Sequence, residues 1–244
     1  MGRCALALWM LAGCDSAFGL HAAQLADGAT APRCTQITPT PLFCADFDDK
    51  TTTLYVQGIA AAAPNPPSGV TTTLEAETIS PGYALRIATT GPSYTFGAPQ
   101  TSALSVATVE ASFSLNIESF SASSPTVIAD VGLNTPSYNH CFAELGIGAG
   151  SALIAQSHCG SSNPDIYETI TVLPALPQGW VHVAMSYNIT AGTTSFQIDN
   201  TTPVVLNMQF AGHPAGAPHA TFGMQSSMAV TATIGIDDIV VTAP

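Results

Sequence analysis

Carboxylates are the residues of this chain that could carry acid–base chemistry. Cleavage of a glycosidic bond uses two carboxyl groups, and a two-residue step along a strand puts both on one face. The nearest approach to this spacing is Glu75 and Glu77, which we interpret as a solvated strand end. The remaining candidates lie singly in separate segments: Glu110, Glu118, Glu144 and Glu168. The Gly-x-Ser-x-Gly motif, which holds a nucleophilic serine on a sharp turn, is also absent. The sequence therefore predicts that the protein is not an enzyme.

Two His–Cys pairs have the residue types of a zinc site built from two histidines and two cysteines. They are His140-Cys141 and His158-Cys159. Adjacent residues of a strand point to opposite faces, so a histidine and its neighbouring cysteine cannot easily reach one ion. We therefore favour a disulfide here over zinc.

The same pairs flank a hairpin signal. Residues 148–151 (GAGS) separate the segments 139–147 and 152–159, and this composition is typical of a tight turn. A hairpin centred on residue 150 places Cys141 directly opposite Cys159 and makes one face mostly apolar. Register and disulfide therefore support each other.

The N-terminus has the features of a secretory signal. Arg3 precedes an apolar run over residues 4–13, which is far shorter than the roughly 20 residues that span a bilayer as a helix. Residues 11–14 (LAGC) resemble the lipobox of bacterial lipoproteins. The resemblance implies that residues 1–13 are removed and that Cys14 carries lipid, whose acyl chains would anchor the protein. An ordinary signal cleaved near residues 17–19 is the alternative.

The segment 14–40 would then comprise the lipidated cysteine and a flexible tether, because it is Ala-rich without a sustained period. Four cysteines remain in the exported chain and imply two disulfides. Of the three connectivities, local spacing favours Cys34 with Cys44 and Cys141 with Cys159.

The charge excludes a nucleic-acid binder. The 244 residues include 4 Lys+Arg and 16 Asp+Glu, a formal net charge of −12 at pH 7. Contact with phosphates needs a basic patch, which four scattered cations cannot make. With 46% hydrophobic and 8% charged residues, the chain can bury a large core. No break in composition follows residue 40, so residues 41–244 are predicted to form one domain.

Nearly every segment beyond residue 40 has the pattern of a β-strand: short, rich in Val, Ile, Thr and Phe, and interrupted by Pro, Gly, Asn or Ser. The alternation is clearest over residues 109–117, where odd positions are apolar and even positions polar. Roughly 13 to 15 strands at regular spacing predict an all-β sandwich or barrel.

Several short motifs, in this order, resemble the concanavalin A-like lectin/glucanase superfamily and its laminin G-like bacterial domains. They are residues 42–49 (LFCADFDD), 83–87 (YALRI), 176–183 (LPQGWVHV), 196–200 (FQIDN) and 234–241 (IGIDDIVV). The resemblance covers residues 41–242. It implies a two-sheet antiparallel jelly-roll sandwich in which the first and last strands pair. The Glu-x-Asp-x-Glu strand of the superfamily's glucanases is absent here.

The implied pairing of the first and last strands would bring Asp46, Asp48 and Asp49 close to Asp237 and Asp238. Carboxylates with backbone carbonyls suit calcium, and many relatives hold a structural calcium in such a place. We expect Asp48 and Asp237 to be its ligands. The alternative is that these carboxylates only deter edge-to-edge pairing.

Sugar binding usually needs exposed aromatic faces. Once the signal is removed, Trp180 is the only tryptophan, and its place in a strand motif predicts a core residue. Tyr94, Tyr138 and Tyr167 flank expected loops and are the candidates to line a ligand cleft.

The sequence thus predicts an exported, lipid-anchored domain of the bacterial cell envelope, in the outer or inner membrane, facing the periplasm or the surface. It would bind a polysaccharide or an envelope protein without catalysis, an inference by analogy of fold. The alternatives are a structural envelope lipoprotein with no small ligand and a divergent glycosidase or polysaccharide lyase. The last requires two carboxylates that face one another across a cleft.

Overall fold

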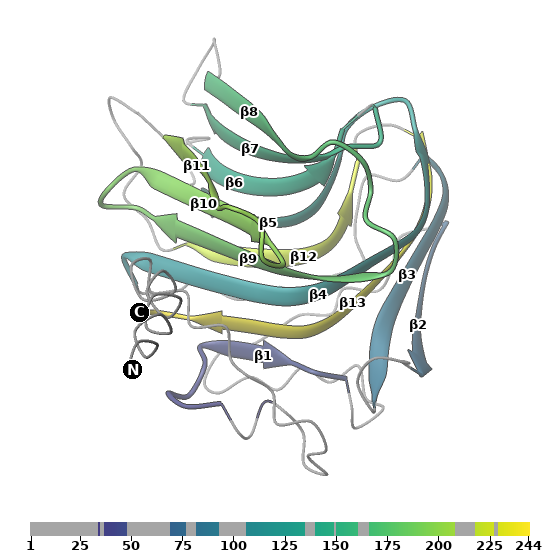
Figure 1. Cartoon of the computed structure of the whole chain (residues 1–244), viewed down its shortest axis with the longest axis horizontal. Helices are drawn as coiled ribbons and strands as arrows, with labels where there is room; N and C mark the ends of the chain where they lie inside the picture. The colour runs from purple at the N-terminus through teal and green to yellow at the C-terminus, as the bar shows by residue number, and fades with distance from the viewer. Residues whose placement is uncertain are drawn as a thin grey trace, which may run out of the picture.

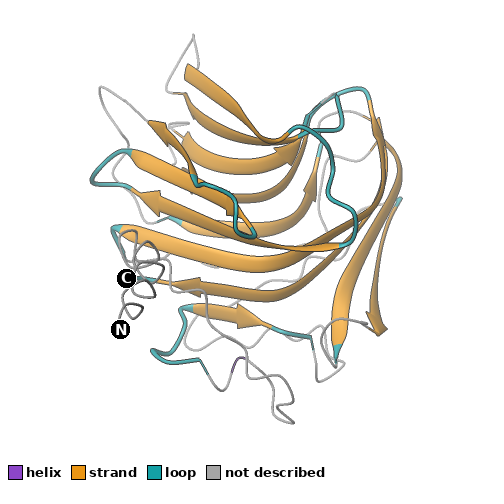
Figure 2. Cartoon of the chain, in the orientation of Figure 1, coloured by secondary structure: helices purple, strands orange, loops and turns teal. Residues whose placement is uncertain are grey.

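The strands lie in two antiparallel sheets. The computed structural model describes residues 34, 37–47, 69–76, 82–92, 106–134, 140–148, 150–160, 166–207, 218–226 and 229–244. Over these ranges the chain forms 13 strands, and Figure 2 shows no helix among them. The predicted all-β fold class is confirmed.

The larger sheet has eight strands in the order β11-β10-β9-β4-β13-β3-β2, with β1 paired to β13. Their bounds are β1 (Phe43–Ala45), β2 (Val70–Ala76), β3 (Tyr83–Pro92), β4 (Thr108–Ala122), β9 (Trp180–Asn188), β10 (Thr193–Ile198), β11 (Val204–Asn207) and β13 (Ala229–Thr242). The smaller sheet has five strands in the order β12-β5-β6-β7-β8. These are β5 (Thr126–Asn134), β6 (His140–Ile147), β7 (Leu153–Gly160), β8 (Ile166–Leu173) and β12 (His219–Gln225).

Period-two alternation explains how the sheets pack. In β4 the odd positions from Val109 to Ile117 are buried, while the even positions between them are partly exposed. The core joins the sheets through aromatic rings, because Phe222 of β12 lies 6.3 Å from Phe43 and 5.4 Å from Phe113 of the larger sheet, measured between ring centroids. The long strands β4 and β13 curve, and the five-stranded sheet lies on the inner side of the bend (Figure 1).

The first and last strands pair, as the resemblance implied. Phe43 lies opposite Val241 and Ala45 opposite Ile239. The predicted disulfide between Cys34 and Cys44 is present, and both cysteines are buried. The disulfide ties Cys34, which lies within the segment predicted to be a tether, to β1, and the domain boundary at residue 41 stays a prediction.

The predicted hairpin register is confirmed. In the pair β6–β7, Cys141 lies opposite Cys159. Cys141 is disulfide-bonded, so it is not a thiolate ligand of zinc. The side chain of Cys159 lies outside the described part, and its bond to Cys141 stays a prediction that the register supports.

The residues of the predicted signal, including the lipidation site Cys14, also lie outside the described ranges. Among the residues that are described, the structure has no helix with the length and apolar character needed to cross a bilayer.

Candidate functional site

A row of polar side chains crosses all five strands of the smaller sheet. Thr221 pairs with Asp130, Asp130 with Glu144, Glu144 with Gln156, and Gln156 with Thr169. Residues directly opposite one another across paired strands point to the same face, so this row shares one side of the sheet. It is the side away from the core, because the residues next to the row along the central strands are buried in the sandwich: Ala129, Val131, Ala143, Leu145 and Ala155.

Asp130 and Glu144 bring two carboxyl groups together in this row. Cβ atoms of directly opposite residues lie about 4.5–5.5 Å apart. Burial raises the pKa of Asp130 to about 8, the negative charge of Glu144 adds to the rise, and a hydrogen bond with Thr221 opposes it. Burial also raises the pKa of Glu144, to about 7. The pair therefore retains at least one proton at neutral pH.

His219 of β12 lies beside this pair. Its Nε2 is 3.8 Å from Oδ1 of Asp130, too long for a hydrogen bond. Burial lowers the pKa of His219, so the imidazole is neutral at pH 7. Oδ1 of Asp130 is buried and has no hydrogen-bond partner among the described residues.

A second row runs beside the first, with His219 opposite Gly132, Gly132 opposite Phe142, and Phe142 opposite His158. The ring of Phe142 covers Gly132 and would overlap any Cβ placed there. The same ring meets His219 edge to face, with centroids 5.9 Å apart. Glycine at 132 thus lets an aromatic ring lie across β5 next to the acid pair. We call the face that carries both rows the polar face; it comprises Thr221, Asp130, Glu144, Gln156, Thr169, His219, Phe142 and His158.

The predicted cleft tyrosines are tested only in part. The backbone of Tyr167 lies in the second row, opposite His158, and its side chain is outside the described part. Tyr94 and Tyr138 lie outside the described residues altogether.

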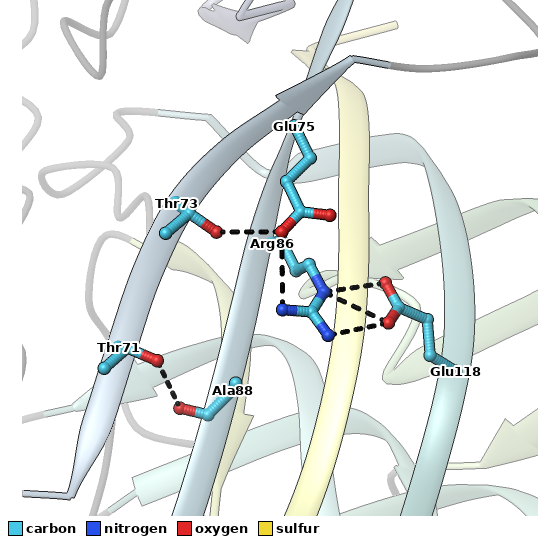
Figure 3. A network of polar contacts seen from close by, with 6 residues as sticks. All are labelled: Thr71, Thr73, Glu75, Arg86, Ala88 and Glu118. Atoms are coloured by element: carbon cyan, nitrogen blue, oxygen red, sulfur yellow. Dashed lines mark hydrogen bonds and ion pairs between the residues drawn. The ribbon is translucent and has the colours of Figure 1, made fainter.

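Glu118, predicted to be isolated, and Glu75, predicted to belong to a solvated strand end, converge on the opposite face of the sandwich. Arg86 donates from Nε and Nη2 to the carboxylate of Glu118 at 2.9–3.0 Å, and its Nη1 lies 3.4 Å from Oε1 of Glu75 (Figure 3). Glu118 sits in a β-bulge, since Thr233 pairs with Ser119 but Ile234 with Ile117. A bulge re-aims a side chain, which explains why strand spacing alone did not reveal this contact.

Trp180 is not a core residue, and that prediction is wrong. It is partly exposed and lines a pocket of about 190 Å³ beside Arg86. In β9 the buried positions are Val183, Met185 and Tyr187, so even positions face outward. The alternation within β9 was the signal that could have corrected the prediction.

The expected calcium ligands do not form a site within the described part. Asp48 lies outside it, and Oδ1 of the buried Asp237 accepts the N–H of Asp238 at 2.7 Å. Asp46 is fully buried, with Oδ2 accepting the N–H of Cys34 at 2.9 Å and Oδ1 without a partner among the described residues. No group of three or more His, Cys, Asp or Glu side chains that could hold a metal occurs among them. Calcium here stays a prediction, with Asp46 as an additional candidate.

Sequence reasoning missed Asp130 and His219. An aspartate inside an otherwise apolar strand, in residues 126–133 (TVIADVGL), was the available signal for the first. No sequence signal identified His219, because its contact with Asp130 depends on which strand lies beside β5. Of the remaining glutamates, Glu168 accepts the backbone N–H of Asn207 at 3.1 Å and so links the edges of the two sheets.

Comparison with known proteins identifies the fold. No protein-family model matches the sequence, and no curated protein matches it significantly. The solved structure of the cellulose induced protein Cip1 aligns with a TM-score of 0.54 and 14% identity, over 82% of this chain and 97% of that one. An alginate lyase aligns with a TM-score of 0.52 and 11% identity, over 70% of this chain and 83% of that one.

The binding domain of botulinum neurotoxin DC in complex with SialylT aligns with a TM-score of 0.53 and 14% identity. It is matched over 84% of this chain and 48% of that one, so this chain spans about half of its length. At such identities the likeness concerns the fold alone. It confirms the two-sheet jelly-roll sandwich that the resemblance to the concanavalin A-like superfamily implied.

Proposed function

We propose that this protein is an exported, lipid-anchored component of the bacterial cell envelope that binds a polysaccharide on the polar face. The observation that carries the proposal is the unbroken polar row from Thr221 to Thr169. Neighbouring strands lie about 4.7–4.9 Å apart, so a row over five strands is about 19 Å long. An extended oligosaccharide of several sugar units fits that length.

The chemistry of the row suits a ligand rich in hydroxyl groups. A protonated carboxyl both donates and accepts hydrogen bonds, as hydroxyls do, and the raised pKa of the partly exposed Glu144, about 7, keeps part of its carboxyl protonated near neutral pH. Gln156 adds an amide whose Nε2 donates to Oγ1 of Thr169 at 3.0 Å. Phe142 supplies an apolar ring beside them. Groups that are mostly uncharged at neutral pH favour a neutral saccharide over a charged one.

The structural neighbours support the ligand class. One is named for alginate, one is described as induced by cellulose, and one is a binding domain in complex with SialylT. These descriptions belong to those proteins, and they motivate the choice of polysaccharides to be tried.

Cleavage of the bound polysaccharide is a second candidate function, which the Asp130–Glu144 pair favours. Two carboxyl groups that lie opposite one another and have raised pKa values can serve as the general acid and the general base of a reaction. Binding without cleavage is nonetheless the better supported function. Asp130 is only 6% exposed, so its carboxyl is poorly placed to reach a glycosidic carbon or its leaving group.

The test is a pull-down of the detergent-solubilised full-length protein on insoluble or immobilised polysaccharides, including cellulose, alginate and peptidoglycan. The variant Gln156→Ala removes the amide of the polar row. Its matched control is Gln197→Ala on the larger sheet, whose Nε2 donates to the carbonyl of Thr201 at 2.9 Å. We expect Gln156→Ala to weaken retention and Gln197→Ala to leave it unchanged.

Retention on none of the polysaccharides, or equal retention of the two variants, would overturn the proposal. Release of new reducing ends or of unsaturated sugars from a retained polysaccharide would establish the second candidate function in place of binding alone.

A further inference from the structure

The larger sheet carries a pocket on its outer side, across the sandwich from the polar face. The pocket has a volume of about 190 Å³, and five strands of the larger sheet contribute residues to it. We call it the Trp180 pocket; its principal residues are Glu75, Arg86, Asn116, Glu118, Trp180 and Gly235. Nothing in the proposed polysaccharide binding uses these side chains, so the two sites are independent.

Gly235 makes room for the indole of Trp180. Trp180 pairs with Asn116 of β4, and Asn116 pairs with Gly235 of β13. A Cβ on residue 235 would lie 2.7 Å from Cη2 and 3.0 Å from Cζ2 of the indole. The ring therefore reaches across β4 as far as β13, and any larger residue at 235 would displace it. The pocket has an aromatic wall held in a defined place.

The charged wall of the pocket has a net negative charge. Its one guanidinium, on Arg86, faces the carboxylates of Glu118 and Glu75 (Figure 3). Nε and Nη2 of Arg86 both donate to the carboxylate of Glu118. Nη1 of Arg86 lies 3.4 Å from the carboxylate of Glu75. An anionic ligand would have to displace Glu118 from this bidentate contact, so anions are disfavoured.

Glu75 has an oxygen to spare. Its contacts with Thr73 and Arg86 both use Oε1. Oε2 has no partner within the described part of the chain, and the side chain is 52% exposed. Glu75 and Trp180 both line the pocket, and a carboxylate together with an indole is suited to recognise a cation.

From these features we propose that the Trp180 pocket binds the ammonium group of a small cationic ligand, primary or quaternary. The indole of Trp180 contributes a cation–π contact, and Glu75 supplies the counter-charge. The size of the pocket agrees, because it is smaller than the roughly 300–1,000 Å³ of pockets that enclose drug-sized ligands. The net charge of −12 also raises the local concentration of cations near the protein.

The test uses choline and its neutral carbon isostere 3,3-dimethylbutan-1-ol as probes. Tryptophan fluorescence is recorded on the full-length variant Trp9→Phe, in which Trp180 is the sole tryptophan. We expect choline to change the emission in a saturable way and the isostere, which has the same shape without the charge, to bind at least about fivefold more weakly. Added salt should weaken choline binding.

The decisive variant is Glu75→Gln, made at a side chain that is 52% exposed. Loss of its charge should weaken choline binding about fivefold, whereas the matched control Glu168→Gln should leave it unchanged. Gly235→Ala should abolish the fluorescence response by displacing the indole.

Three outcomes would each reject the ammonium site: no saturable response to choline, equal affinity for choline and the isostere, or unchanged affinity in Glu75→Gln. A response to glucose that Glu75→Gln does not alter would instead assign the pocket to neutral sugars. None of these results bears on retention by polysaccharides, so the two proposals fail separately.

Discussion

Asp130 lies directly opposite Glu144 in the antiparallel pair β5–β6, and each of the two carboxyl groups holds its proton more tightly than it would in water. Neighbouring His219 has its pKa moved in the other direction, downward. All three shifts have burial as their first cause. The acid pair of the polar face therefore carries less negative charge around neutral pH than two carboxyl groups of ordinary pKa would carry.

Stability should fall as the pH rises from about 6.5 to 8. Over this range the unfolded chain has already ionised its carboxyls, whose ordinary pKa values are 3.8 and 4.5, while folded Asp130 and Glu144 still release protons near 8 and 7. The folded state then binds more protons than the unfolded state, so the free energy of unfolding decreases with pH. His219 opposes this only slightly, because the unfolded histidine, with an ordinary pKa of 6.5, is half protonated at pH 6.5 and has lost nearly all of that remaining proton by pH 8.

Thermal unfolding followed by circular dichroism at pH 6.5 and pH 8 measures the effect. Each 1 kcal/mol moves Tm by about 2–4 °C in a domain of this size. Glu144→Gln, which is neutral at both pH values, should show a smaller drop and a higher Tm than the wild type at pH 8. A wild-type Tm that rises between the two pH values would contradict the shifted pKa values.

Gly132→Ala should destabilise the domain by about 1–3 kcal/mol through overpacking. The added methyl would overlap the Phe142 ring and lie 2.7 Å from the backbone carbonyl oxygen of Cys141, which cannot rotate away. Gly150→Ala is the matched control, because a Cβ there meets no atom within 4 Å. Equal Tm values for the two variants would show that the close approach of β5 and β6 is not as described.

Cys141→Ser should lower stability by about 2–5 kcal/mol, the usual cost of losing a native disulfide. Peptide mapping without reduction should recover Cys141 linked to Cys159, as the strand register requires. A link from Cys141 to any other cysteine, or an unchanged Tm in Cys141→Ser, would exclude the predicted bond. Cys34→Ser, which breaks the bond to Cys44, serves as the comparison.

Cys14→Ala should move the protein from the membrane fraction to the soluble exported fraction. Two or three acyl chains anchor a protein stably, whereas the remaining sequence would have no lipid to insert. Fractionation followed by immunoblotting measures the distribution, with Cys4→Ala as the control within the signal segment. A variant that stays with the membrane would show that Cys14 is not the anchor.

The fold could be predicted because its signals are local. Alternation over residues 109–117 placed β4 correctly, and the glycine-rich turn at 148–151 fixed the register that sets Cys141 opposite Cys159. Both depend on contacts within a strand or between strands that are adjacent in sequence, where the two-residue period and turn geometry apply.

The candidate sites were not predicted from the sequence because they depend on non-local contacts. Asp130 meets His219 only because β12 lies at the edge of the smaller sheet next to β5. Glu118 reaches Arg86 only through a bulge in β4. Trp180 was assigned to the core from a short motif, although the burial of Val183 and Met185 puts the even positions of β9 on the outside. Neither strand order nor bulges can be read from spacing within one strand.

The bond between Cys34 and Cys44 determines where a mechanical load enters the domain. Cys44 is the middle residue of β1 and pairs with Val240 of β13. A pull on the chain before Cys34 would therefore be transmitted through the disulfide to Cys44, in the middle of β1. From there the load would act on the pairing of β1 with β13, the first and last strands of the fold.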